Sequence, residues 1–167
     1  WDADILGDFA IDYRDPSKKI PMETLAAMKE ADLATQGVYY RRQLSLALSD
    51  LRLHLGEVQD PQAVVNAATA EAFFPPQAGT HFAAYWGHLT GYDAGYYGYA
   101  WADAIAADMA TVFQNAPDRY RDREAGMRLR RQIYEVGGSV DPSEAVRRFL
   151  QREPSNDAFL KTLGLGQ

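Results

Sequence analysis

The chain has 167 residues, of which 47% are hydrophobic and 24% charged, the composition of one ordinary globular domain with a real core. The formal net charge of −6 argues against nucleic acid as the main partner, and the lack of cysteine excludes disulfides, a thiol nucleophile and thiolate metal ligands. No apolar run approaches the roughly 18 residues that a membrane span needs, so we expect no membrane partner and a cytoplasmic location.

The first part of the chain has the pattern of helices with short breaks. Residues 1–13 place Trp1, Ile5 and Phe9 on one helical face, and Pro21 suits the first turn of the next helix. A long helix is predicted over about residues 38–56, where leucines recur at helical spacing. Alternation within this stretch also permits a strand, but its length and its Ala, Leu, Arg and Gln content favour helix.

Helix-start signals recur in the second part. Asp60 and Pro61 predict an N-cap and a first turn, and the helix that they begin ends at the Pro/Gly loop 75–80. Further helices are predicted at about 96–113 and 121–136.

After Gly137 and Gly138 the helical pattern resumes. Asp141, with Glu144 three residues later, has the spacing of a capping box and starts another helix. We find no repeat and no alternation of strands with helices. The sequence therefore predicts an all-α protein, with residues 1–167 forming a single all-helical domain.

The stretch GHLTGYDAGYYGYAW, residues 87–101, crowds glycines against tyrosines. Its spacing puts Tyr92, Tyr96 and Tyr99 each directly after a glycine. Four glycines favour a loop that turns into a helix near Tyr96, where backbone N–H groups, phenol hydroxyls and His88 could meet a ligand. The alternative is plain packing, because glycines at this spacing also let two helices approach closely. The residue pattern alone leaves both interpretations open.

Several stretches together resemble one family. In order they are DFAIDY near the start, DLRLH at 50–54, WGHLTGYDAGYYGYAW at 86–101, GGSVDP at 137–142 and RRFLQREPSNDAFL at 147–160. They resemble the C-terminal part of the zinc oligopeptidases that include thimet oligopeptidase, oligopeptidase A and dipeptidyl carboxypeptidase. Two positions depart from that family: Gly91 stands alone where two glycines are common, and Gln151 stands where glycine is usual.

The resemblance implies an irregular multi-helix fold, the C-terminal portion of a zincin-type oligopeptidase catalytic domain. That family binds zinc with HExxH and a downstream Glu, and cleaves short peptides. None of His54, His81 and His88 lies in such a motif, so we expect no metal ligand in this chain and zinc only in the intact enzyme. The chain should be inactive alone and should need the metal-binding half of the domain as its partner.

The resemblance also implies roles for the Gly–Tyr stretch. Tyr99 would donate to the oxyanion that forms on the peptide carbonyl, and His88 would hydrogen-bond the substrate or the tetrahedral intermediate. Tyr92 and Tyr96 would position the peptide. The substrate-binding positions that we assign are Tyr92, Tyr96, Gly91 and Gly95.

Other functions stay open. The chain could be a non-catalytic peptide-binding or interaction module, or one half of a split peptidase, so its status as an enzyme is not settled by the sequence. If the metal half is absent, uncovered apolar surface should cause self-association. We expect His54 to be structural, and Asp108, on the apolar face of its helix, to pair with one of the arginines at 119–131.

Overall fold

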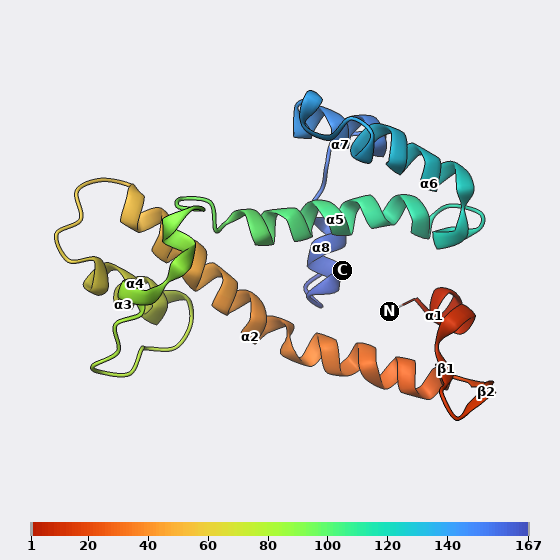
Figure 1. The fold of residues 1–167 in the computed structure, drawn as a ribbon, viewed down its shortest axis with the longest axis horizontal. Coiled ribbons are helices and arrows are strands. Elements are labelled where there is room, and N and C mark those ends of the chain that lie inside the picture. Colours follow the sequence, from red (N-terminus) through yellow and green to blue (C-terminus); the bar gives the residue numbers. More distant parts are fainter. Residues whose placement is uncertain (1, 167) are drawn as a thin grey trace. The chain divides into compact units, whose positions relative to one another are not determined.

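The computed structural model describes residues 2–166, so Trp1, which we expected on the first helical face, lies outside them. The described chain is helical apart from one two-stranded sheet, which confirms the all-α, multi-helix class (Figure 1). Its contacts form two compact units: one runs up to Ala34 and resumes at Ala104, and the other is Thr35–Asp103. The single-domain organisation remains a prediction.

The N-terminal segment contains a hairpin that the sequence analysis missed. Helix α1 (Ala3–Phe9) is capped by Asp2, and strands β1 (Ile11–Asp12) and β2 (Asp15–Lys19) then pair antiparallel. The turn forms because Asp12 accepts a hydrogen bond from the backbone N–H of Arg14 at 2.8 Å. Such a side-chain bond competes with helical hydrogen bonding, which explains why the helical interpretation fails here.

Helix α2 (Met22–His54) is one continuous helix, so the predicted start at about residue 38 was wrong. Gly37 lies inside it, and a Cβ there would meet nothing within 4 Å. Good helix formers on both sides carry the helix through this glycine, whose cost is only about 1 kcal/mol. The strand alternative for this region is also wrong. Toward its C-terminal end, α2 buries Leu46 and Ala47.

Helix α3 (Pro61–Ala72) begins where the sequence predicted. The Asp60 side chain accepts the backbone N–H of Ala63 at 3.0 Å, and Pro61 occupies the first turn. A helix-free loop that includes residues 75–80 follows, and then the short helix α4 (Phe82–Tyr85). The backbone N–H of Ala83 donates to the Gln62 side chain at 3.3 Å, which ties α4 to α3.

The unit that resumes at Ala104 has its apolar core around Phe149. Phe149 is wholly buried on helix α7 (Pro142–Leu150). Side chains from helix α5 (Gly98–Gln114) and helix α6 (Arg123–Leu129) pack against it. The predicted helix 121–136 is therefore α6 continued by a π-helical turn at Arg130–Tyr134. Helix α8 (Asp157–Thr162) completes the described chain.

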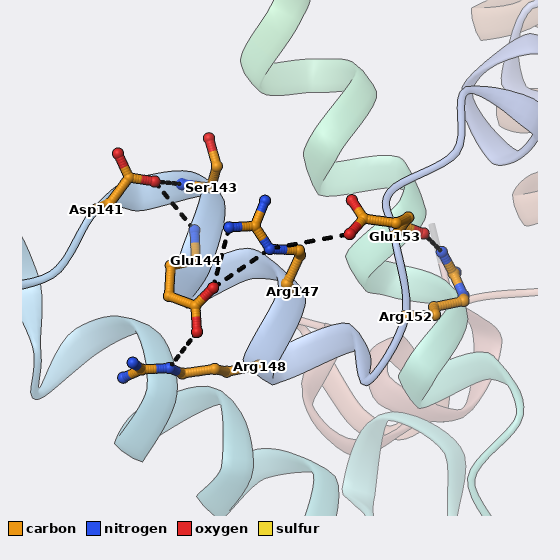
Figure 2. A network of polar contacts seen from close by, with 7 residues as sticks. All are labelled: Asp141, Ser143, Glu144, Arg147, Arg148, Arg152 and Glu153. Atoms are coloured by element: carbon orange, nitrogen blue, oxygen red, sulfur yellow. Dashed lines mark hydrogen bonds and ion pairs between the residues drawn. The ribbon is translucent and has the colours of Figure 1, made fainter.

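The start of α7 confirms its predicted N-cap (Figure 2). Asp141 accepts the backbone N–H groups of Ser143 at 2.9 Å and Glu144 at 3.1 Å. The Glu144 carboxylate is occupied by Arg147 at 3.0 Å and Arg148 at 2.9 Å, whose hydrogen bonds hold its pKa below the usual range. Glu144 thus supports α7 through charged pairs one turn further along the helix.

Helix α7 ends at Gln151, which has a left-handed backbone with φ of 59°. The backbone N–H of Gln151 donates to the carbonyl of Arg147 at 2.8 Å, as in a helix C-cap. A left-handed backbone at this place favours glycine, which adopts this conformation without strain, so Gln151 is strained here.

Asp108 is buried and paired, but with a different arginine from those predicted. Arg152 binds it through both guanidinium Nη atoms, and the backbone N–H of Ser155 donates to it at 2.8 Å. Arg119 and Arg121, which we expected to be candidates, instead bind Asp2 and Asp8 at the N-terminal segment.

None of the helices within residues 2–166 is long and apolar enough to cross a membrane.

Candidate functional site

The Gly–Tyr stretch folds as a series of turns that leads into a helix, as predicted. A 3₁₀ turn covers Gly87–Thr90, turns continue through Tyr97, and α5 begins at Gly98. These turns bring the imidazole and phenol side chains of the stretch together. We call the group His88, Tyr92, Tyr96 and Tyr99 the tyrosine cluster.

His88 lies at the centre of the tyrosine cluster. Its ring centroid is 4.8 Å from that of Tyr96, 5.8 Å from that of Tyr92 and 6.4 Å from that of Tyr99. Trp86 stacks on the imidazole at 5.6 Å, and Tyr96 and Tyr99 are 5.0 Å apart. The structure therefore brings together the four side chains that the sequence analysis singled out.

The members of the tyrosine cluster differ in exposure. Tyr92 and Tyr99 are 76% and 57% exposed, whereas the His88 side chain is only 11% exposed. Burial and the neighbouring Tyr99 raise the pKa of Tyr96, so it remains a protonated phenol at neutral pH. The exposed phenols can reach a ligand, and the largely buried imidazole and half-buried Tyr96 support them.

The two glycines assigned to substrate binding have different surroundings. A Cβ at Gly95 would lie 3.1 Å from the carbonyl oxygen of Tyr92, tighter than ordinary contact. Gly91 has an extended φ of −163°, and a Cβ there would meet nothing within 4 Å. Local packing thus favours glycine at Gly95, while no atom lies within 4 Å of a Cβ built at Gly91.

The sequence analysis did not assign a role to Asp50, which lies under the loop. Asp50 is wholly buried, and its carboxylate accepts the backbone N–H groups of Ala94 and Tyr96, both at 2.9 Å. Its Oδ2 atom is 3.4 Å from Nε2 of His88. The only signals in the sequence were its place in DLRLH and its charge beside leucines on α2.

His54 is structural, as expected. Its Nδ1 atom lies 2.7 Å from the carbonyl oxygen of Asp50, one turn earlier on α2. A carbonyl can only accept, so this nitrogen carries the hydrogen. His81 is exposed at the N-cap of α4, and its side chain forms no cap hydrogen bond there.

The donor set of residues 2–166 does not fit a zinc site. Within residues 2–166, no three His, Cys, Asp or Glu side chains gather into a group that could hold a metal ion. His54 and His88 both face Asp50, whose two oxygens already accept backbone N–H groups. The geometry of the tyrosine cluster offers hydrogen-bond donors and ring faces instead.

Comparison with known proteins shows the family to which the chain belongs. Peptidase family M3, a family of zinc metallopeptidases, matches residues 1–165. The chain belongs to peptidase family M3. It is 36% identical to a thimet-like oligopeptidase of Dictyostelium discoideum, 33% to oligopeptidase A of Salmonella typhimurium and 30% to saccharolysin of Saccharomyces cerevisiae, covering 99% of this chain in each case. The resemblance noted in the sequence is confirmed.

The M3 chain described here spans about a quarter of the length of those relatives, between 24% and 25%. The chain thus aligns with one segment of each of those longer relatives. In the tyrosine cluster, exposed phenols lie close to a largely buried histidine.

Proposed function

We propose that the chain is the C-terminal portion of a zinc-dependent oligopeptidase and supplies its substrate and oxyanion contacts. The observation that carries this proposal is the convergence of Tyr92, Tyr96 and Tyr99 on His88, with two of the phenols exposed. Membership of family M3 supports a peptide as the substrate class, and we propose a short one.

In this proposal Tyr99 donates its phenol hydrogen to the oxygen of the scissile carbonyl as negative charge develops there. The side chain of Tyr99 is exposed, so its hydroxyl can reach a bound peptide. Such a donor speeds the reaction when its hydrogen bond to the oxyanion is stronger than its hydrogen bond to the uncharged carbonyl. Tyr92, also exposed, holds the peptide beside the scissile bond, and the protonated Tyr96 donates to the substrate or to the loop. His88 hydrogen-bonds the substrate or the tetrahedral intermediate.

Gly91 and Gly95 shape the backbone next to the peptide in this proposal. The open space at Gly91 admits an extended peptide, and Gly95 allows the tight turn that presents Tyr96. Polar backbone groups near the peptide would then supplement the phenol contacts.

Zinc, when bound in the intact enzyme, supplies the activated water. The residues that the structure describes do not fit a zinc site, so we assign the metal to the metal-binding half of the catalytic domain. That half is the partner, in the same or a separate chain, and the present chain is inactive without it. We expect the enzyme to work in the cytoplasm.

A fluorescence-quenched peptide tests the proposal directly. The chain alone, with and without added zinc, should not cleave it, whereas the longer protein that carries the metal half should cleave it and should stop when zinc is chelated. Zinc-dependent cleavage by the chain alone would show a metal site of its own and contradict the division of roles. Peptide binding without cleavage by the longer protein would favour a non-catalytic binding module.

A further inference from the structure

A wholly buried carboxylate sits under the tyrosine cluster. Asp50 has no exposed surface, and burying a charge is costly unless hydrogen bonds satisfy it. Each oxygen has its own donor: Oδ1 accepts the backbone N–H of Ala94, and Oδ2 accepts that of Tyr96, both at 2.9 Å. Charge-assisted bonds of this kind are about twice as strong as neutral ones. One side chain of α2 therefore fixes two points of the loop.

One of those two points is strained. Ala94 has a left-handed backbone with φ of 55°, although it is not glycine. This conformation is unfavourable for a residue that carries a Cβ. It persists when the surroundings impose it. The hydrogen bond from the backbone N–H of Ala94 to Asp50 is the contact that holds this turn in place.

The same carboxylate faces the histidine of the cluster. Nε2 of His88 is buried and has no hydrogen-bond partner within residues 2–166, and Oδ2 of Asp50 lies 3.4 Å from it. An unprotonated Nε2 would turn its lone pair toward this carboxylate, which favours the tautomer that carries the hydrogen on Nε2. Asp50 would then orient the imidazole through Nε2, and His88 would meet a ligand with the other atoms of its ring.

We propose that Asp50 is a positioning residue for the reaction, which holds the Ala94–Tyr96 turn and His88 so that the tyrosine cluster meets the peptide in one arrangement. Asp50 does not touch the substrate. It acts through the loop on Tyr96 and Tyr99, whose rings are 5.0 Å apart. This inference rests on the proposed function for its catalytic consequence, while the loop geometry can be measured without any activity.

The substitution Asp50→Asn tests this role with almost no change in shape. An asparagine offers one acceptor oxygen and one NH₂ group, so in either orientation the NH₂ group faces a backbone N–H that Asp50 now accepts. In the longer protein we expect kcat to fall at least about tenfold, with KM changed less than about threefold, because the loss is in placement of groups that act in the transition state. Zinc content should stay unchanged.

Hydrogen–deuterium exchange of the same protein separates the geometry from the activity. Asp50→Asn should speed exchange in the segment 91–98. The matched control is Asp108→Asn, which removes an equally buried carboxylate held by Arg152 and Ser155, and should leave the exchange of 91–98 unchanged. Unchanged exchange and unchanged kcat in Asp50→Asn would overturn the proposal. Faster exchange in a protein whose wild type cleaves no peptide would reject the proposed function alone.

One further measurement keeps the proposal testable if Asp50→Asn unfolds. In the wild-type protein, the amides of Ala94 and Tyr96 should exchange at least about tenfold more slowly than those of Asp93 and Tyr97, which Asp50 does not hold. Equal rates would overturn the proposal.

If the variant folds, it can be combined with Tyr99→Phe. The loss of kcat in the double variant should be clearly smaller than the product of the two single losses, because Asp50 acts partly through Tyr99. A full product of losses would contradict action through the cluster and leave a purely structural role for Asp50.

Discussion

Oδ2 of Asp50 lies 3.4 Å from Nε2 of His88, although 38 positions separate the two residues in the sequence and neither belongs to a local motif with the other. The pair joins the end of α2 to the 3₁₀ turn at Gly87–Thr90. The same carboxylate accepts two backbone N–H groups of the loop. Buried hydrogen bonds therefore hold the tyrosine cluster in place in addition to apolar packing.

The left-handed C-cap of α7 gives a prediction about stability. Gln151→Gly should raise the free energy of unfolding by about 1 kcal/mol, because glycine relieves the left-handed strain but loses more chain entropy on folding. Urea denaturation measures this difference. Gln151→Ala is the control, since alanine keeps the Cβ and should gain nothing. Equal stability of the glycine and alanine variants would show that no strain resides at this position.

The Asp108–Arg152 pair predicts a pH dependence of stability. Hydrogen bonds from Arg152 hold the pKa of Asp108 below its ordinary value. The pair therefore stabilises the folded chain above the unfolded pKa of about 4, and this contribution is lost as the pH falls through the lower folded pKa.

Asp108→Asn should accordingly lower the free energy of unfolding by about 2 kcal/mol at pH 7. The loss should be much smaller at a pH below both the folded and the unfolded pKa of Asp108. Urea unfolding at the two pH values measures it, with Asp118→Asn at an exposed aspartate as control. A cost that is the same at both pH values would mean that the charge of Asp108 does not stabilise the fold.

Crowding at Gly95 predicts that a side chain at this position destabilises the fold. Gly95→Ala should destabilise the chain by about 1–3 kcal/mol, because its Cβ would lie 3.1 Å from the backbone oxygen of Tyr92. Gly98→Ala, at the open first position of α5, should be neutral or stabilising by at most about 1 kcal/mol. Thermal unfolding compares the two variants. If both lose the same stability, the close contact at Gly95 is not the cause.

The isolated chain should associate with itself. Large apolar side chains of the unit Thr35–Asp103 are exposed, among them Val38, Tyr39, Leu44 and Phe74. In the proposed enzyme the metal-binding half would cover such surface, and without it contiguous apolar area drives association. Sedimentation velocity over a wide range of concentration should show oligomers, and a single monomer throughout would contradict this expectation.

Local signals in the sequence located several helix starts and the end of one helix. Asp60 with Pro61, and Asp141 with Pro142, marked two helix starts because N-caps and first-turn prolines act within a few residues. The left-handed Gly137, with φ of 50°, follows the end of the helical segment that was predicted to stop there.

The features that the sequence did not reveal depend on distant contacts or on competing local bonds. The partner of Asp108 is Arg152, 44 positions away, and nearer arginines looked equally suitable. Asp50 meets Ala94 across a similar separation of 44 positions. The hairpin at β1–β2 was missed because the side chain of Asp12 closes the turn. The site residues were predicted from the resemblance to the zinc oligopeptidases. The spacing of the glycines and tyrosines alone did not distinguish a ligand-binding loop from a packed helix.

Turnover of Tyr99→Phe in the longer zinc-containing protein tests the central claim most directly. The matched control is Tyr97→Phe, which removes the same hydroxyl from a similarly exposed tyrosine two positions earlier in the same segment. We predict that Tyr99→Phe lowers turnover about a hundredfold with zinc retained, while Tyr97→Phe stays within about twofold of wild type. Unchanged turnover of Tyr99→Phe, with full zinc content, would contradict the claim that this chain supplies the oxyanion contact.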